Sequence, residues 1–252
     1  MKASGTDGMQ ELFHIIEEPR VCSYLPEEAA SLDIRLVSSM SVAEYAGQMA
    51  RGYRRFGMQV FRPACEACME CRSMRVPVQR FELTGSQRRV LRQNRYIRAE
   101  LHPAITNHPA IARMEHIELF NRYHEFMHRQ RGWPLQHEEP ESYYRDFVLD
   151  PARCGRQWLY FNGDQLIGVA LMDEVPGAIS LVYCYYDPDW RDQSPGTFSI
   201  LNQLLYAKYQ GLDYAYFGYM VEGCASLNYK LRYQPREFLV GLPDDDEEPL
   251  WV

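Results

Sequence analysis

Two apolar stretches separated by Asn162-Gly163-Asp164 restrict the fold of this chain more than any other feature. Residues 157–161 and 165–172 are mostly apolar or aromatic, and Asn-Gly readily adopts the positive φ angles of a tight turn. The sequence therefore predicts a β-hairpin. After it we expect a strand at 178–186, a helix at 195–211, a strand at 214–219, a short helix at 225–232 and a strand at 237–240. Three antiparallel strands followed by alternating helices and strands indicate an α+β fold with a mixed sheet.

The first half of the chain has a weaker pattern. Residues 19–26 are typical of a loop. Ser41 can cap a helix whose buried side is Val42, Tyr45, Ala46 and Met49 and which we expect to end at Gly57. Ser86 can cap a second helix that runs to Asn94. Further elements are expected as strands at 35–37, 58–61 and 74–78 and as a long helix at 110–131.

The cysteines suggest a metal centre more than a disulfide framework. There are seven, at positions 22, 65, 68, 71, 154, 184 and 224, an odd number without a recognisable secretion signal. Cys65, Cys68 and Cys71 have the spacing C-x2-C-x2-C, and Cys22 is a distant fourth thiol. Such a set fits zinc or an iron–sulfur centre. The alternative is a cluster of free, reduced thiols beside a substrate loop.

Positive charge is concentrated in one block, although the chain as a whole carries a formal net charge of -7. Residues 51–98 hold twelve Arg against three Glu, whereas the acidic residues 244–248 form a tail. Arg88, Arg92 and Arg95 fall on one face of the second predicted helix. Arginine binds phosphate through two parallel hydrogen bonds and stacks on bases. The block is therefore a candidate phosphate-binding surface, with a solvated face of surface ion pairs as the alternative.

Several catalytic motifs are absent or weak. The run from His124 to His128 matches H-E-x-x-H, but the residues after it do not continue a metalloprotease pattern, so we expect two helical histidines with ordinary partners. No phosphate-binding G-x-x-x-x-G-K-[ST] motif and no G-x-S-x-G nucleophile motif occurs. The loop from Arg191 to Gly196 precedes a predicted helix and could present backbone N–H groups to an anion.

Longer ordered motifs resemble a known family. They are Cys22-Ser-Tyr-Leu-Pro, the Cys65 to Cys71 loop, Ser86-Gln-Arg-Arg-Val-Leu-Arg, Tyr183-Cys-Tyr-Tyr-Asp-Pro with Ser194-Pro-Gly-Thr-Phe-Ser-Ile, Tyr216-Phe-Gly-Tyr-Met-Val, and Cys224-Ala-Ser-Leu-Asn-Tyr-Lys. Together these motifs resemble the aminoacyl-tRNA–protein transferases of the arginyl-transferase type, and most closely their bacterial aspartate/glutamate leucyltransferase branch. The resemblance extends over about residues 11–241. Eukaryotic members carry Cys-Gly-Tyr-Cys where this chain has Cys22 to Leu25, so one thiol of that element is missing here.

The resemblance implies an acyltransferase (GNAT)-like mixed sheet and a division into two regions. Residues 1–105 would form an N-terminal α+β region with the cysteine loop and the arginine block. Residues 106–252 would form the GNAT-like domain with the acidic tail. We expect a cytoplasmic protein, because no stretch approaches the roughly 20 apolar residues of a membrane span and no signal pattern precedes Gly8.

The activity implied by the resemblance is transfer of leucine from Leu-tRNA to the α-amine of proteins with N-terminal Asp or Glu, in the N-degron pathway. An aminoacyl ester is already activated, so the chemistry requires no cofactor; a zinc or iron–sulfur centre would be structural. An acidic acceptor side chain needs a cation, and tRNA needs a basic surface with stacking aromatic residues. Alternatives are arginine as the donor amino acid, an acyl-CoA-dependent N-acetyltransferase, and a tRNA-binding module without activity.

The resemblance and the residue types together select candidate site residues. The predicted catalytic residues are Tyr186 and Asp187, at the end of the strand where an acyltransferase sheet opens to its substrates. Arg75 is expected to pair with the acceptor carboxylate. The remaining substrate-binding candidates are Arg88, Arg89, Arg92, Tyr183, Tyr185, Ser194, Gly196, Asn228, Tyr229 and Lys230, and the candidate metal ligands are Cys22, Cys65, Cys68 and Cys71.

Overall fold

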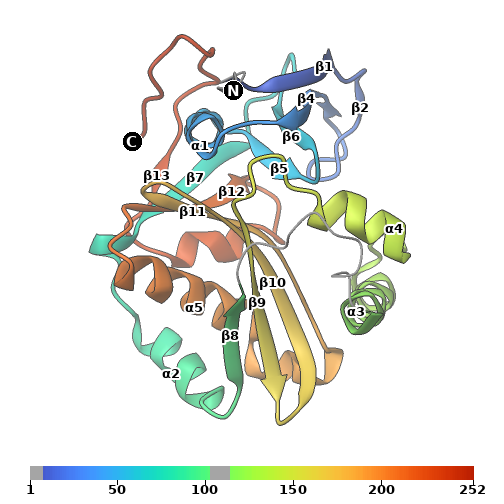
Figure 1. Cartoon of the computed structure of the whole chain (residues 1–252), viewed down its shortest axis with the longest axis vertical. Coiled ribbons are helices and arrows are strands. Elements are labelled where there is room, and N and C mark those ends of the chain that lie inside the picture. The colour runs from blue at the N-terminus through green and yellow to red at the C-terminus, as the bar shows by residue number, and fades with distance from the viewer. Residues whose placement is uncertain (1–7, 103–113) are drawn as a thin grey trace, which may run out of the picture.

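The computed structural model describes residues 8–102 and 114–252 (Figure 1). Its strands are β1 (Gln10–Ile16), β2 (Arg20–Val21), β3 (Ala29–Ala30), β4 (Leu32–Ser39), β5 (Arg54–Phe56), β6 (Gln59–Pro63), β7 (Arg72–Pro77), β8 (Arg98–His102), β9 (Gly155–Asn162), β10 (Gln165–Val175), β11 (Ala178–Tyr186), β12 (Tyr214–Met220) and β13 (Glu237–Phe238). The α-helices are α1 (Val42–Ala50), α2 (Gly85–Gln93), α3 (Met114–Arg131), α4 (Pro140–Tyr143) and α5 (Pro195–Tyr209). Short helical turns are η1 (Val78–Arg80), η3 (Tyr144–Val148), η4 (Pro188–Gln193) and η5 (Asn228–Arg232).

The central element is a seven-stranded sheet in the order β13-β7-β12-β11-β10-β9-β8. Its neighbours are antiparallel except β11 and β12, which are parallel. The prediction of an α+β fold with a mixed sheet is therefore confirmed. Strands β7 and β8 precede residue 105, so both predicted regions contribute to this sheet; the predicted boundary at residues 105 and 106 lies outside the described residues.

Helices cover both faces of the large sheet. Helices α5 and α2 lie on one side and α3 and α4 on the other (Figure 1). Leu201, Leu204 and Phe198 of α5 pack in the core of the first side, and Phe120 and Tyr123 of α3 pack in the core of the second. The second core is unusually aromatic, because β11 presents Tyr183 and Tyr185 to it. The ring of Tyr183 contacts those of Phe120, His124 and Phe147, and the ring of Tyr185 contacts those of Phe120 and Tyr143.

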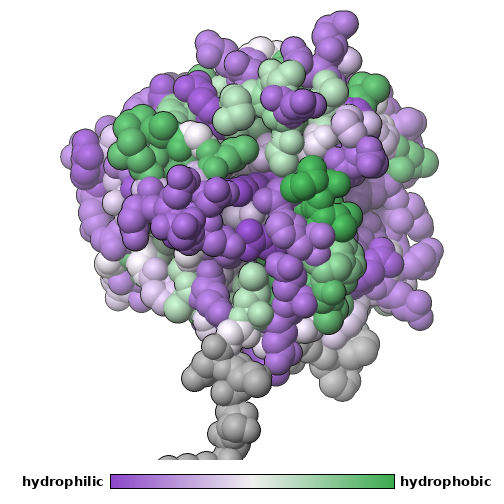
Figure 2. Space-filling model, turned by 90° about the horizontal axis from the view of Figure 1, so that it is seen from above, coloured by the Kyte–Doolittle hydropathy of each residue, from purple (hydrophilic) through white to green (hydrophobic). Residues whose placement is uncertain are grey.

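A smaller sheet in the order β1-β4-β6-β5 lies with α1 at one end of the large sheet, at the top of Figure 1. Tyr45 and Met49 of α1 are buried there, as predicted. The acidic C-terminal segment returns to this region: Asp245 pairs with Arg35, and Trp251 donates a hydrogen bond to the carbonyl oxygen of Ala50. Seen from above, this face is largely hydrophilic with separate apolar patches (Figure 2). No helix in the described ranges is long and apolar enough to cross a membrane.

Local sequence signals predicted the β9–β10 hairpin correctly but misplaced one end of each of two helices. The hairpin of β9 and β10 turns at Gly163, whose φ is 60°. The cap of α2 was predicted wrongly: Thr84, not Ser86, accepts the backbone N–H of Gln87, and the Gln87 side chain completes the capping box. Helix α1 ends at Ala50 and not at Gly57, which lies between β5 and β6 with a φ of 54°.

Other boundaries also shifted. Strand β4 extends over Leu32–Ser39, much further than the predicted 35–37, and the predicted loop at 19–26 contains β2 of a small hairpin with β3. The predicted helix at 225–232 is the shorter turn η5, and the last strand is only Glu237–Phe238. Residues 110–113 of the predicted long helix lie outside the described residues.

Candidate active site

The sheet opens between β11 and β12. Their parallel pairing covers only residues 178–180 of β11 and 214–216 of β12, whereas β11 continues to Tyr186 paired with β10 alone. The two strands therefore diverge, and backbone groups that face the gap have no strand partner. Unpaired backbone groups at such an opening are free to bind a side chain or a ligand.

The guanidinium of Arg54, on β5, occupies the start of this opening. It donates hydrogen bonds to the carbonyl oxygens of Leu181 on β11 and Tyr216 on β12, the second at 3.4 Å. Gly218 makes room for it: a Cβ at this position would lie 3.2 Å from Cζ of Arg54. The φ of Gly218 is 72°, and the pairing of β12 with β7 is shifted between Tyr216 and Gly218. Arg54 thus links β11 and β12 at the point where their backbone pairing ends.

Lys230, on η5, is a second cation at the same place. Its side chain is buried, with a relative exposure of 6%, and its ammonium donates a hydrogen bond to the carbonyl oxygen of Tyr219 on β12. Burial and, to a lesser extent, the positive charge of Arg54 together lower the pKa of Lys230 to about 7. Among the described residues, neither Arg54 nor Lys230 has a carboxylate partner. The opening is therefore locally cationic.

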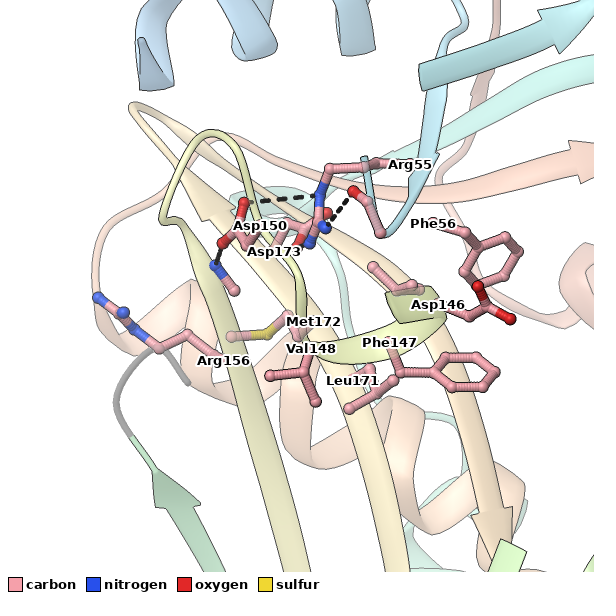
Figure 3. A pocket seen from close by; sticks show the side chains of 13 residues that line it. Arg55, Phe56, Asp146, Phe147, Val148, Asp150, Arg156, Leu171, Met172 and Asp173 are labelled. Carbon is pink, nitrogen blue, oxygen red and sulfur yellow. Dashed lines mark hydrogen bonds and ion pairs between the residues drawn. The ribbon is translucent and has the colours of Figure 1, made fainter. Parts of the chain in front are cut away.

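The position of Arg54 depends on its neighbour Arg55, because successive residues of a strand point to opposite sides. Arg55 is buried between Asp173 on β10, at 2.5 Å, and Asp150, at 3.7 Å (Figure 3). It also donates to the carbonyl oxygens of Gly57 and Leu149. These contacts anchor β5 to the large sheet and hold Arg54 over the opening.

The same acidic cluster is the one group of the described residues whose donor atoms are close enough to suggest a metal site. The ligand atoms of Asp150, Cys154 and Asp173 lie within 4.8 Å of one another. Arg55 already supplies a positive charge to both carboxylates, and Tyr45 donates to Asp173 at 2.8 Å. Burial and the two carboxylates raise the pKa of Cys154 well above its ordinary value, so its thiol stays protonated. We therefore describe this cluster as a buried ion-pair network.

The four predicted metal ligands lie near one another and near the opening. Burial raises the pKa of Cys71 to about 12, and the neighbouring thiols of Cys22, Cys65 and Cys68 contribute to the increase. Cys71 also interacts electrostatically with Lys230. The sulfur atoms are more widely spaced than in the acidic cluster, since among the described residues no three of them lie within 4.8 Å of one another.

A cavity of about 310 Å³ adjoins the cysteine loop. Cys65, Cys68 and Cys71 line it together with residues 238–242 and Val252. The C-terminal segment and the cysteine loop thus share one cavity.

The aromatic candidates on β11 are packed rather than open. The hydroxyl of Tyr183 lies 2.8 Å from Nε2 of His124, and the hydroxyl of Tyr185 lies 2.6 Å from that of Tyr143. His124 is buried, which lowers its pKa to about 4. His128, the second histidine of the H-E-x-x-H motif, is exposed and contacts the carbonyl oxygen of Trp133 through Nδ1 at 2.6 Å. The motif therefore consists of two histidines with separate partners.

Tyr186 and Asp187 lie at the end of β11, away from Arg54. The ring of Tyr186 packs against Tyr123 and Trp190. The carboxylate of Asp187 accepts the backbone N–H of Asp189, which caps η4, and pairs with Arg122 at 2.9 Å. Both residues thus have structural contacts, and their predicted catalytic role stays a prediction.

Arg75 is already neutralised. Its Nε lies 2.8 Å from Glu237 on β13, its guanidinium stacks 3.7 Å from the ring centroid of Tyr214 and 4.4 Å from that of Trp251, and Nη1 donates to the hydroxyl of Tyr216. An acceptor carboxylate would have to compete with Glu237. Its predicted role also stays untested.

The predicted phosphate-binding residues lie on a separate surface. Arg88, Arg89 and Arg92 are exposed on α2, and no ion pair joins them to another described residue. Helix α2 packs against α5 and η4: Asn94 bonds the carbonyl oxygen of Gln193 at 2.8 Å. Ser194 precedes α5 with a φ of 59°, and its side chain caps no backbone group. A Cβ on Gly196 would meet nothing within 4 Å.

Tyr229 lies beside the opening, and Asn228 precedes it on η5. Both are exposed on η5, Tyr229 by 40%. The hydroxyl of Tyr229 interacts electrostatically with Cys184 on β11 and with Arg54. Among the predicted residues, the structure thus brings Tyr229, Lys230 and the cysteines to the opening.

Sequence reasoning missed Arg54 and the network of Arg55, Asp150 and Asp173. The available signal was the pair Arg54-Arg55, flanked by Tyr53 and Phe56 between the glycines Gly52 and Gly57. Adjacent arginines between aromatic residues indicate polar partners where they are buried, but those partners are remote in sequence.

Comparison with known proteins decides the family. The family model described as "Arginine-tRNA-protein transferase, N terminus" matches residues 20–89, and that described as "Arginine-tRNA-protein transferase, C terminus" matches residues 115–240. The chain belongs to the arginine-tRNA-protein transferase family. The predicted family is thus confirmed, and the protein is an aminoacyltransferase.

Relatives cover nearly all of this transferase. A protein of Helicobacter hepaticus named "Aspartate/glutamate leucyltransferase" is 36% identical over 241 residues, covering 95% of this chain and 97% of the relative. Proteins with the same name from Campylobacter jejuni (34% identity, 91% of this chain and 94% of the relative) and Pseudomonas putida (35%, 88% and 92%) also match.

Solved structures similar to the transferase are more distant. FemX has a TM-score of 0.44 at 12% identity, covering 87% of this chain and 65% of that chain. L-PGS from Bacillus licheniformis has a TM-score of 0.42 at 13% identity, covering 72% and 51%.

Proposed function

We propose that the transferase moves leucine from Leu-tRNA to the α-amine of proteins that begin with Asp or Glu. The observation that carries this proposal is the near full-length similarity to proteins named aspartate/glutamate leucyltransferase. The matched family favours an aminoacyl-tRNA donor over acyl-CoA. Because its description names arginine, arginine is the second candidate donor. Aminoacyl-tRNA is an intracellular substrate, so we place the reaction in the cytoplasm as part of protein degradation through N-terminal residues.

The chemistry requires positioning and charge more than a reactive side chain. The neutral α-amine attacks the ester carbonyl, a C–N bond forms, the C–O bond to the tRNA breaks, and the released 3′ or 2′ oxygen takes up a proton. An α-amine has a pKa of about 7.7–8.0, so a useful fraction is neutral at physiological pH. Holding both substrates in reactive geometry can supply much of the rate. We place the two groups in the opening between β11 and β12, where unpaired backbone N–H groups can stabilise negative charge on the carbonyl oxygen.

We place the tRNA on the surface of α2 and the start of α5. Arg88, Arg89 and Arg92 would bind phosphates, with the backbone at Ser194 and Gly196 as a second contact. From there the acceptor end would pass Asn228 and Tyr229 to reach the opening. Tyr183 and Tyr185 would form part of the wall of the site. Tyr186 and Asp187, at the end of β11, would help to orient this wall.

The donor set of Cys22, Cys65, Cys68 and Cys71 fits a zinc ion or an iron–sulfur centre chemically. Burial and then the crowded thiols raise the pKa of Cys71 to about 12, and a cation would stabilise the ionised forms of these thiols. When bound, such a centre would fix the two cysteine loops beside Lys230. The reaction itself passes through the protein's own groups and the two substrates.

The proposal is tested by incubating the protein with labelled Leu-tRNA or Arg-tRNA and peptides that begin with Asp, Glu, Asn or Ala. We expect a mass increase of one leucine on the Asp and Glu peptides. Arginine transfer would replace leucine as the donor, and transfer from neither tRNA would refute the proposal.

The tRNA surface predicts a salt dependence. Each phosphate contact contributes about 0.7–0.9 to the slope of log K against log salt. Replacing Arg88, Arg89 and Arg92 by Ala should therefore reduce the slope for tRNA by about 2–3 units, measured by fluorescence anisotropy. The control is Arg145→Ala, an exposed arginine paired with Asp146. An unchanged slope in the triple variant would place tRNA elsewhere.

A further inference from the structure

We propose that Arg54 and Lys230 form the binding site for the side-chain carboxylate of the acceptor protein's N-terminal residue. This inference rests on the proposed function and adds the residues that select an acidic acceptor. It places the carboxylate at the start of the opening between β11 and β12, next to the point where the α-amine must meet the ester.

The first support is the lack of an acidic partner. The three buried arginines of the described residues pair with carboxylates: Arg35 with Asp245, Arg55 with Asp173, and Arg62 with Asp33. The half-buried Arg75 likewise pairs with Glu237, whereas Arg54, which is also half-buried, does not pair with a carboxylate. No carboxylate of the described residues pairs with Arg54 or Lys230. Burying a cation without a counter-charge is costly, and a ligand that supplies the charge removes this cost.

The second support is the number of free donors. A guanidinium has five N–H donors. Arg54 donates from Nη2 to the carbonyl oxygen of Leu181 and from Nη1 to that of Tyr216. A lysine ammonium has three N–H donors, and Lys230 uses one of them on the carbonyl oxygen of Tyr219. Both cations thus have donors left for a carboxylate, while the backbone contacts fix their heads in place.

The third support is the surroundings. Tyr24, from the loop between β2 and β3, and Tyr229 both interact electrostatically with Arg54. Leu25 reaches the loop before η5, 3.7 Å from the Cβ position of Gly223. Aromatic and apolar groups around two cations exclude water and strengthen a charged contact. Arg54 itself is only half-buried, so the site has a route from solvent.

The site predicts a specific kinetic pattern. Peptides that begin with Asp and with Asn have the same size and differ in charge, so their ratio of kcat/KM isolates the carboxylate. Hydrogen bonds to charged groups are strong enough that Arg54→Gln and Lys230→Gln should each reduce kcat/KM for the Asp peptide by about tenfold or more. Rates with the Asn peptide and the KM for Leu-tRNA should change little, so the preference for Asp should collapse.

Two further variants define the comparison. Arg145→Gln should leave the Asp preference intact, because Arg145 is exposed and paired with Asp146. Arg75→Gln tests the competing assignment: if it abolishes the Asp preference while Arg54→Gln and Lys230→Gln keep it, the proposal is wrong. Equal losses on Asp and Asn peptides in the Arg54 and Lys230 variants would also overturn it. Absence of transfer by the wild-type protein on every peptide would instead refute the proposed function.

A measurement on the unaltered protein avoids any folding defect of the variants. The chain has three lysines, Lys2, Lys208 and Lys230, so carbodiimide coupling of a carboxylate to a lysine is easy to map. A peptide whose sole carboxylate is the side chain of its N-terminal Asp should couple to Lys230, detected by peptide mass mapping. Lys208, which donates to the carbonyl oxygen of Phe81, is the internal control. Coupling at Lys208 or Lys2 without Lys230 would overturn the assignment.

Discussion

Arg54 and Arg55 are adjacent in sequence but lie in opposite electrostatic environments. Arg55 enters a closed network in which Asp150 and Asp173 supply the counter-charge, and Tyr45 satisfies the second oxygen of Asp173. Arg54 lies in an opening of the sheet, where its guanidinium donates hydrogen bonds to two backbone carbonyl oxygens. An arginine stays charged when it is buried, so it cannot avoid the desolvation cost by losing its proton. A completed ion pair therefore indicates a structural role, and an incomplete one indicates a place for a ligand.

The largest expected effect on the free energy of unfolding comes from removing one carboxylate from the Arg55 network. Asp173→Asn keeps the shape of the side chain but leaves Arg55 with a weaker, more distant carboxylate. Removing one partner of a buried ion pair typically costs about 3–5 kcal/mol in the free energy of unfolding. Chemical denaturation should show a loss of this size. Asp245→Asn is the matched control, since Asp245 pairs with Arg35 but is itself 56% exposed, and it should cost less than about 1 kcal/mol. Equal losses in both variants would show that the Arg55 network does not anchor β5.

A smaller effect on the free energy of unfolding is expected from His124, a buried group that can lose its charge. His124 lies beside Tyr183 of β11, and burial lowers its pKa to about 4. The unfolded chain binds this proton near pH 6.5. Between these values the unfolded state holds more protons, so stability falls as the pH drops from about 6.5 to 4, by up to about 1.4 kcal/mol per unit, and is unaffected above 6.5.

The measurement is the difference in unfolding free energy between the wild-type protein and His124→Phe across this range. The difference should be constant above about pH 6.5 and should shift against the wild type below it. A difference that stays constant down to pH 4 would mean that His124 is protonated in the folded protein. His128→Phe is the control, because His128 is exposed.

These contrasts explain which features could be predicted from the sequence. The hairpin at Gly163 and the buried side of α1 depend on residues close together in the chain, so their patterns were visible. Arg54 depends on Leu181 and Tyr216, which are 127 and 162 positions away. Its environment also depends on where β11 and β12 stop pairing, which no local pattern encodes.

The candidate residues divide in the same way. Lys230 and the cysteines were selected by their motifs, and the structure places them near one another. Arg75 was selected by its charge and its place after the cysteine loop, but the sequence did not reveal Glu237 as its partner. For α2, the sequence analysis selected Ser86 as the cap, whereas in the structure Thr84 caps the helix and Gln87 completes the capping box.

The smallest expected change in stability tests the opening itself through Gly218. Gly218→Ala adds a Cβ 3.2 Å from Cζ of Arg54 at a φ of 72°, so it should cost about 1–2 kcal/mol through backbone strain and also displace the guanidinium. Gly163→Ala is a matched control: its φ is 60°, but its Cβ would meet nothing within 4 Å. Both variants should lose similar stability in thermal unfolding. We expect the preference for Asp over Asn peptides to fall in Gly218→Ala alone. If both variants keep that preference, the exact position of Arg54 does not matter for acceptor selection, and the contrast between the two arginines is confined to stability.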